Sequence, residues 1–267
     1  MLIVGERINA SRKLVNAAVC QRDVEHIKKE AVSQSDAGAD FIDVNVGTFV
    51  NNEGEMLEWV INVVQGAVDK PLCLDSPNPD VLIRGLKLCK NTPMINSISG
   101  EPGRYEKIVP LVKEFDTNIV VLCIGEQGMP SSVEERVNYG SVLIDRLVKD
   151  NVAVDKIYVD PLIIPLGTDN KQGAYVLETL RVFKAKYPGI HFICGLSNIS
   201  YGLPNRWLIN QVFLVSAMAA GLDGAILDPT DKKMMANLYV ANAILGNDEY
   251  CMNYISAHRE GKLGIEK

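Results

Sequence analysis

One plan is shared by the segments Gly38-Ala39-Asp40-Phe41-Ile42-Asp43-Val44-Asn45 and Gly221-Leu222-Asp223-Gly224-Ala225-Ile226-Leu227-Asp228. In each segment a glycine closes a stretch with helical spacing, as a glycine in the left-handed conformation does just after a helix. A short apolar run follows and ends in a polar residue, a pattern that indicates a buried strand. The two segments therefore predict one helix–strand unit that the chain uses more than once.

The rest of the chain repeats this alternation. Strands are predicted near residues 2–6, 40–45, 71–75, 93–96, 118–123, 156–160, 191–195 and 223–228, with helical segments between them. Ser131 and Ser132, followed by Glu134 and Glu135, form a capping box and predict that a helix begins near residue 132. Strict alternation predicts a parallel sheet, and eight repeats favour closure into a (β/α)₈ TIM barrel, an α/β fold. The alternative is an open doubly wound sheet, but no Gly-x-Gly-x-x-Gly follows the first strand.

Length and composition predict one soluble domain over residues 1–267. The chain has 47% hydrophobic residues, 22% charged residues and a net charge of −6, with no cluster of Lys and Arg that indicates nucleic acid binding. No apolar run approaches the roughly 18 residues of a membrane span, and the N-terminal segment does not resemble a signal peptide. The six cysteines show no paired spacing and are interpreted as reduced, buried thiols. We expect a cytoplasmic protein without a membrane partner.

Polar side chains occupy the carboxyl end of almost every predicted strand, where the chemistry of such barrels takes place. They are Glu6 with Asn9 just beyond, Asp43 and Asn45, Asp75, Asn96, Asp160, Asn198 and Asp228. Any one of them alone is explained as well by capping of the next helix or by loop hydrogen bonds. Their recurrence at seven of the eight predicted strand ends favours a shared ligand site.

The composition of this ring limits the ligand. Carboxylates accept from the ring NH and amino group of a pterin-like heterocycle, amides donate to its keto oxygen, and the carboxylates repel free phosphate. The three histidines, His26, His191 and His258, lie away from the ring, so a Ser-His-Asp or Cys-His site is disfavoured. No Cys/His cluster has zinc-ligand spacing, and no metal is expected, although carboxylate-bound Mg²⁺ is left open as an alternative.

Six strings in register resemble the methyltetrahydrofolate:corrinoid protein methyltransferases, which belong to the pterin-binding TIM barrels. They are Gly5-Glu6-Arg7-Ile8-Asn9, Asp43-Val44-Asn45-Val46-Gly47, Cys73-Leu74-Asp75-Ser76, Met94-Ile95-Asn96-Ser97, Asp160-Pro161-Leu162 and Gly195-Leu196-Ser197-Asn198-Ile199-Ser200. The segment from Asn205-Arg206 to Ala219 is similar to a helix of the same family. Together these strings cover almost the whole chain in order.

The resemblance implies that a methyl group moves between N5 of tetrahydrofolate and the cobalt of a corrinoid, in a direction that stays open. Asp75, Asn96 and Asp160 would hold the pterin, and Asn198 would be the catalytic residue at N5. Gly195 and Ser197 are expected to contact folate, with Glu6, Asp43, Asn45, Arg206 and Asp228 as weaker candidates. The other interpretation of Asn198 is a cap for the helix that starts near Asn205. The resemblance also implies a homodimer.

Cobalamin is expected on a separate corrinoid protein that docks over the open barrel end. Ser256-Ala257-His258-Arg259-Glu260-Gly261 only approaches an Asp-x-His-x-x-Gly cobalamin motif, and six residues follow it. One alternative function is a dihydropteroate synthase-like enzyme, although the short Asn9-to-Lys13 loop lacks the expected Ser/Gly-rich string. Another is a non-catalytic folate-binding module of a methionine-synthase-like assembly.

Overall fold

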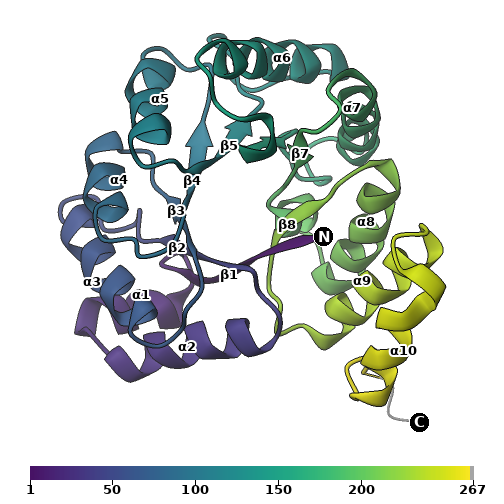
Figure 1. The fold of residues 1–267 in the computed structure, drawn as a ribbon, viewed down its shortest axis with the longest axis horizontal. Coiled ribbons are helices and arrows are strands. Elements are labelled where there is room, and N and C mark those ends of the chain that lie inside the picture. The colour runs from purple at the N-terminus through teal and green to yellow at the C-terminus, as the bar shows by residue number, and fades with distance from the viewer. Residues whose placement is uncertain (265–267) are drawn as a thin grey trace.

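The computed structural model describes residues 1–264 and places eight parallel strands inside a ring of helices (Figure 1). The strands are β1 (Leu2–Asn9), β2 (Phe41–Asn45), β3 (Leu72–Asp75), β4 (Met94–Ile98), β5 (Asn118–Leu122), β6 (Ile157–Asp160), β7 (His191–Phe192) and β8 (Gly224–Leu227). The α-helices are α1 (Lys13–Gln21), α2 (Val24–Asp36), α3 (Glu53–Gln65), α4 (Pro79–Leu86), α5 (Arg104–Glu114), α6 (Val133–Lys149), α7 (Gln172–Lys186), α8 (Arg206–Ala220), α9 (Lys232–Ile244) and α10 (Met252–Arg259). Short 3₁₀ helices occupy η1 (Val154–Lys156), η2 (Leu196–Ser200) and η3 (Glu249–Cys251). The predicted (β/α)₈ barrel is confirmed.

Strand pairing runs in the order β7-β6-β5-β4-β3-β2-β1-β8, so the first strand pairs with the last. Leu2 and Gly5 stand opposite Gly224 and Leu227 in that pair. Between β7 and β8 the sheet closes through backbone bonds, because Ile226 donates to the carbonyl of Cys194 at 2.9 Å and Asp223 donates to that of Phe192 at 3.1 Å. The barrel therefore has one weakly paired seam, and η2 begins directly beside it.

The helix boundaries follow from local sequence chemistry. Ser132 caps α6 by accepting from the Glu135 amide at 3.2 Å, and the Glu135 carboxylate accepts from the Ser131 amide at 2.6 Å. Gly38 and Gly221 have φ of +99° and +114°, as expected of glycines that follow a helix. The repeated helix–strand unit is thus confirmed at both places.

The barrel lumen is filled by one layer of buried side chains, and the polar ring lies above it. The lumen residues are Val4, Phe41, Cys73, Met94, Val120, Ile193 and Ile226, with Tyr158 packed against them. Since side chains along a strand alternate in direction, the residue two positions further on each strand faces the lumen again. That step leads from the apolar layer to Glu6, Asp43, Asp75, Asn96, Leu122, Asp160 and Gly195. On β8 it passes the strand end at Leu227 and reaches Asp228, whose carboxylate is bound to Arg7.

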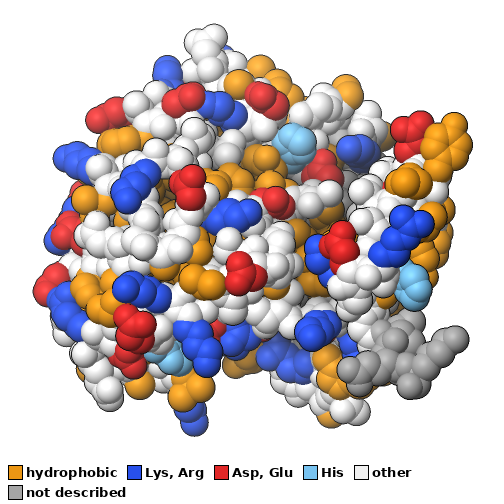
Figure 2. All heavy atoms as spheres, turned by 60° about the horizontal axis from the view of Figure 1, so that its bottom comes forward, with side chains coloured by type: hydrophobic (Ala, Val, Ile, Leu, Met, Phe, Trp, Pro, Cys, Tyr) orange, Lys and Arg blue, Asp and Glu red, His pale blue; other side chains and the backbone are white. Residues whose placement is uncertain are grey.

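The surface agrees with some sequence expectations and corrects another. On the face shown in Figure 2, basic and acidic side chains are interspersed. Within residues 1–264, no helix is both long and apolar enough to cross a bilayer. All six cysteines are free; Cys73, Cys123 and Cys194 are buried, whereas Cys20 and Cys251 are exposed. The prediction that all six thiols are buried was therefore wrong, because Cys20 lies near the end of α1 and Cys251 at the kink before α10.

Candidate functional site

A cavity of about 770 Å³ opens at the carboxyl ends of the strands. Most of the residues predicted from the sequence line it, namely Glu6, Asp43, Asp75, Asn96, Asp160, Gly195, Ser197, Asn198 and Arg206. They come from strands around the barrel and from η2 and α8, so closure of the barrel is what brings them together. Asn45 and Asp228 are not among the lining residues.

Asp160 is a buried carboxyl at the end of β6 without a cationic partner. Its Oδ1 accepts from the Leu162 amide at 2.8 Å, and the Gly195 amide also stabilises its charge. Burial outweighs these two bonds and raises the pKa of Asp160 to about 7. A ligand that offers two N–H donors would compensate for the missing solvation of the carboxylate.

Asp75 lies across the cavity at the end of β3 and is held by Asn45. The Asn45 amide donates to Asp75 Oδ2 at 2.7 Å, so Asn45 orients a lining residue without lining the cavity itself. Burial raises the pKa of Asp75, while the Asn45 bond and the charge of Arg104 partly offset that effect. The Arg104 guanidinium also donates to the carbonyl of Ser97 at 2.6 Å, which supports the end of β4.

Asp43 is the deepest carboxyl of the ring, with 3% of its surface exposed. Its Oδ1 has no hydrogen-bond partner among the described residues. Burial and the nearby charge of Asp75 raise the pKa of Asp43 well above its ordinary value. A buried polar atom left unpaired on a cavity wall is expected where a ligand or water completes the site.

Asn198 lies in η2, on the side of the cavity next to the β7–β8 seam. A Cβ on Gly195 would stand 3.1 Å from Asn198 Nδ2, so the absence of a side chain there allows the amide its position. The preceding Ser197 hydroxyl donates to Glu6 Oε2 at 3.2 Å, and burial raises the pKa of Glu6. The alternative role of Asn198 as a helix cap is not realised, since α8 begins after Asn205 without any side-chain cap.

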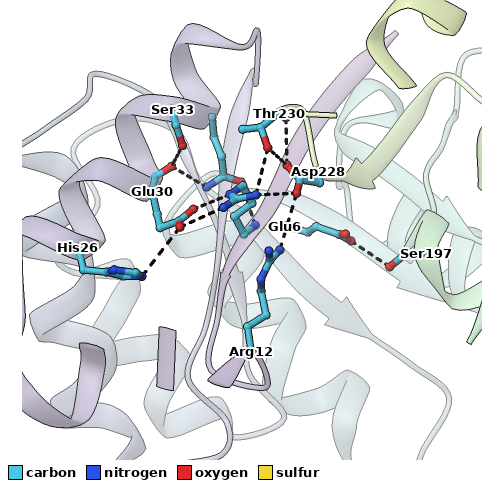
Figure 3. Close-up of polar contacts among 10 residues, drawn as sticks. Glu6, Arg12, His26, Glu30, Ser33, Ser197, Asp228 and Thr230 are labelled. Atoms are coloured by element: carbon cyan, nitrogen blue, oxygen red, sulfur yellow. Dashed lines mark hydrogen bonds and ion pairs between the residues drawn. The ribbon is translucent and has the colours of Figure 1, made fainter. Parts of the chain in front are cut away.

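Asp228 belongs to an ion-pair network beneath the cavity wall (Figure 3). Arg7 donates to Asp228 Oδ2 at 2.8 Å and to Glu30 Oε2 at 2.5 Å, and so connects β8 to α2. Thr230 donates to Asp228 Oδ1 from its hydroxyl at 2.6 Å and from its amide at 3.0 Å. These bonds occupy both carboxylate oxygens, which explains why Asp228 holds the barrel together at β8 instead of facing the cavity.

Several lining residues were missed by the sequence analysis. Arg12 follows β1, and Trp207 and Asn210 belong to α8. They stand beyond the strand ends, where no periodic pattern marks the residues that face inward. The one available signal was a cation, Arg12, three residues after the polar residue Asn9.

No set of three or more His, Cys, Asp and Glu side chains suited to a metal ion is found in residues 1–264. The acidic ring is spread around the cavity and does not converge on one point. Its chemistry fits a flat ligand that carries several donors.

The family model described as "Pterin binding enzyme" matches residues 5–228. The chain belongs to this family. Pterin binding explains why the polar ring contains both carboxylates and the amide of Asn96, because pterins present N–H donors beside a keto acceptor. It also fits the presence in the cavity lining of Asp43, a buried carboxyl whose Oδ1 has no partner among the described residues.

This pterin-binding enzyme is 37% identical over 266 residues to a methylcorrinoid:tetrahydrofolate methyltransferase of Eubacterium limosum. The aligned residues cover 99% of this chain and 98% of the relative. The chain is 32% identical over 241 residues to methionine synthase of Mycobacterium leprae, covering 85% of the chain but 20% of that longer protein. The dihydropteroate synthase of Xanthomonas albilineans in complex with 7,8-dihydropteroate has the same fold. The TM-score is 0.70 at 17% identity, over 91% of this chain and 93% of that one.

Proposed function

We propose that this protein is a methyltransferase that moves a methyl group from a methylcorrinoid to N5 of tetrahydrofolate, giving 5-methyltetrahydrofolate. The observation that carries the proposal is the acidic pterin-sized cavity with one exposed amide, Asn198, near its mouth. The relative of Eubacterium limosum, aligned over nearly the full length of both chains, carries that activity in its name and supports this direction of transfer.

The pterin is expected to bind through the floor of the cavity. Asp160 and Asp75 accept from the ring NH and amino donors, and the Asn96 amide donates to the keto oxygen. Gly195 and Ser197 border the same face, and Glu6 and Asp43 complete the ring. Each bond is strengthened by burial, since the alternative is an unpaired polar group in a dry site.

Methyl transfer needs a nucleophile and a route for one proton. The N5 lone pair attacks the methyl carbon as the cobalt–carbon bond breaks, and N5 then loses its hydrogen as a proton. The corrinoid supplies the methyl group and retains the electron pair of the broken bond. The Asn198 carbonyl accepts from N5–H and so holds the lone pair toward the mouth, while water and the carboxylates receive the proton.

The corrinoid is expected on a separate protein that docks over the mouth of the barrel. The name of the relative from Eubacterium limosum includes a methylcorrinoid, which supports a corrinoid-bearing partner that brings the methyl group to the enzyme. Tyr201 and Trp207, both exposed beside the cavity, are placed where such a partner would approach.

A homodimer in the cytoplasm completes the proposal. Exposed apolar side chains occur along α8, α9 and the segment before α10, namely Leu208, Val212, Ile244, Tyr250 and Met252. Figure 2 shows hydrophobic side chains at the right edge, where α10 lies. Two exposed free thiols, Cys20 and Cys251, suit a reducing compartment. Light scattering of the purified protein tests the dimer, and a monomeric mass would contradict it.

The variant Asn198→Ala tests the catalytic assignment. We expect a methyl-transfer rate lower by about 10²-fold, the usual scale for one hydrogen bond made in the transition state, with a smaller change in tetrahydrofolate affinity. The assay follows the cobalt absorption spectrum after mixing enzyme, tetrahydrofolate and methylcobalamin or a methylated corrinoid protein. Asn170→Ala, in an exposed loop outside the cavity, is the matched control. Unchanged turnover of Asn198→Ala would sink the assignment.

A further inference from the structure

Arg136 is the largest fully buried side chain among residues 1–264. It belongs to α6, which lies on the outside of the barrel next to α7 (Figure 1). Arginines are rarely buried completely unless a carboxylate pairs with them, because removing a charge from water is costly. The acceptors of the Arg136 hydrogen bonds are all neutral oxygens, and no carboxylate of the described residues is among them. A cation buried without an anion indicates a role other than an ion pair.

The acceptors of Arg136 lie at both ends of one loop. Its Nε donates to the Pro161 carbonyl at 3.0 Å, and its Nη2 makes a longer contact of 3.5 Å with the Leu162 carbonyl. The same Nη2 donates to Oε1 of Gln172 at 2.6 Å, where α7 begins. Residues 161–171, between β6 and α7, contain no helix or strand. One planar guanidinium therefore connects the first residues of this loop to the residue that follows its end.

The loop begins with a turn around Asp160, the carboxyl at the end of β6. The Leu162 amide donates to Asp160 Oδ1 at 2.8 Å, so the side chain accepts from the residue two positions later. The same turn follows Asp228, where the Thr230 amide donates at 3.0 Å. Leu162 differs from Thr230 in its positive φ of +59°, which is unfavourable for a bulky L residue. The backbone after Asp160 is therefore held in a conformation that Leu162 alone does not favour.

This turn affects the ligand site directly. Leu162 and Ile163 line the cavity together with Asp160. The Leu162 amide is one of the backbone donors that stabilise the Asp160 carboxylate, while burial raises the pKa of Asp160 to about 7. The thiols of Cys123 and Cys194 lie close enough to sense the charge of Asp160, but burial raises their pKa as well, so they stay neutral. Displacement of the Leu162 amide would therefore make Asp160 harder to ionise.

We propose, resting on the proposed function for the identity of the ligand, that Arg136 is a positioning residue of the pterin site. Its guanidinium holds the carbonyls that follow Asp160 and thereby keeps the Leu162 amide directed at the carboxylate. Arg136 does not line the cavity, so it acts through the backbone and not by contact with tetrahydrofolate. The clamp sets how readily Asp160 ionises, and with it the pH range in which the site accepts pterin donors.

A titration of Asp160 without ligand tests this role. Aspartate is labelled with ¹³C at its carboxyl carbon, and the NMR signal that is missing in Asp160→Asn belongs to Asp160. Arg136→Lys keeps the cation, but a single ammonium group cannot bridge both ends of the loop. We expect the midpoint of the Asp160 titration to rise by about one pH unit, the scale of one hydrogen bond to a charged group. Tetrahydrofolate affinity, measured by calorimetry, should then fall about 5-fold at pH 7 and less than about 2-fold at pH 9.

Two further variants complete the experiment. Gln172→Met removes one acceptor of the guanidinium and should raise the Asp160 midpoint by a smaller amount. Arg7→Met is the matched control, because it breaks a partly buried network around Asp228 and should lower stability without moving the Asp160 midpoint.

An Asp160 midpoint that does not rise in Arg136→Lys, or that rises as much in Arg7→Met, overturns the positioning role. If Arg136→Lys does not fold, the same criterion applies to Gln172→Met. A wild-type protein that binds no tetrahydrofolate refutes the proposed function, whereas the ligand-free titration still decides the role of Arg136.

Discussion

Asp160 and Asp228 occupy equivalent places in the sequence and opposite roles in the structure. Asp160 ends β6 and Asp228 directly follows β8, and each stands two residues beyond a residue that belongs to the apolar lumen layer or packs against it. Asp160 receives only backbone donors and faces the cavity, whereas Asp228 receives Arg7 and Thr230 and faces away from it. The comparison teaches that a strand-end carboxyl becomes part of a ligand site when the protein leaves it without a cation.

The largest effect is expected from Asp160→Asn. Replacing the carboxylate by an amide removes a charged acceptor and points an N–H₂ group at ligand donors, so tetrahydrofolate affinity should fall by about 10²-fold, or roughly 2.7 kcal/mol. Calorimetric titration measures the loss. Asp228→Asn is the counterpart, and its tetrahydrofolate affinity should stay within about 3-fold of wild type. Equal losses in the two variants would refute the distinction drawn between them.

The same Asp160→Asn variant should be more stable than wild type. Burial raises the pKa of Asp160 to about 7, above the value that this group has in the unfolded chain. Between these two pKa values the folded protein therefore binds more protons than the unfolded chain. Its contribution to stability is therefore largest in acid and is lost as pH rises to about 7. The amide keeps an acceptor for Leu162, and thermal unfolding at pH 8 should show a gain of roughly 2 kcal/mol that shrinks at pH 5. A destabilised variant at pH 8 would contradict this account.

Arg7→Met should destabilise the fold by about 2 kcal/mol. The substitution leaves Asp228 and Glu30 without their cation, although their side chains are only 27% and 16% exposed. Urea unfolding measures the change. Arg22→Met, which breaks an exposed pair with Glu55, is the matched control and should cost less than about 0.5 kcal/mol. Similar midpoints for wild type and Arg7→Met would show that the network has little influence.

A smaller effect is expected from pH alone. The carboxylate form of Asp160 is the form that accepts the pterin donors. Below about pH 7 the Asp160 carboxyl must therefore lose a proton before the protein binds tetrahydrofolate. The dissociation constant of tetrahydrofolate should rise up to 10-fold for each pH unit below 7, and level off above it. Titrations between pH 5.5 and 8.5 follow this change. Asp160→Asn should lack this dependence, and a persistent slope would assign the titration to another group.

Much of the fold was predictable because each strand is a short β-branched run between polar residues. Eight strands and the start of α6 were placed within a few residues. The exception is β7, predicted over residues 191–195 but paired only at His191 and Phe192. The chain turns into η2 at Leu196, and Gly195 keeps only an isolated bridge to Ile226. The length of β7 depends on this turn into η2, which the local composition of the strand does not encode.

Side-chain alternation alone could predict the site only where its residues stand on strands; Ser197, Asn198 and Arg206 were predicted from the family resemblance instead. Alternation along β3, β4 and β6 places Asp75, Asn96 and Asp160 in the lumen, and the structure brings them to one cavity. The roles of Asn45 and Asp228 depended on partners about 30 and 220 residues away, as their bonds to Asp75 and Arg7 show. The catalytic role of Asn198 remains a prediction. Arg12 and Trp207 were missed because the direction of their side chains is set by a loop and a helix start.

The pairing of β1 with β8 has a consequence for how the protein folds. Residues 2–5 bond to residues 224–227, so the contacts that close the ring join the two most distant strands of the chain. Contacts of such long sequence separation form late and slow folding. During synthesis the first strand therefore waits for the last, and until then the acidic floor stays open to water and cannot select a ligand. A circularly permuted chain that begins within the loop after α4 would make β1 and β8 consecutive strands, so they should pair earlier, and it would move the late first-to-last pairing to β4 and β3.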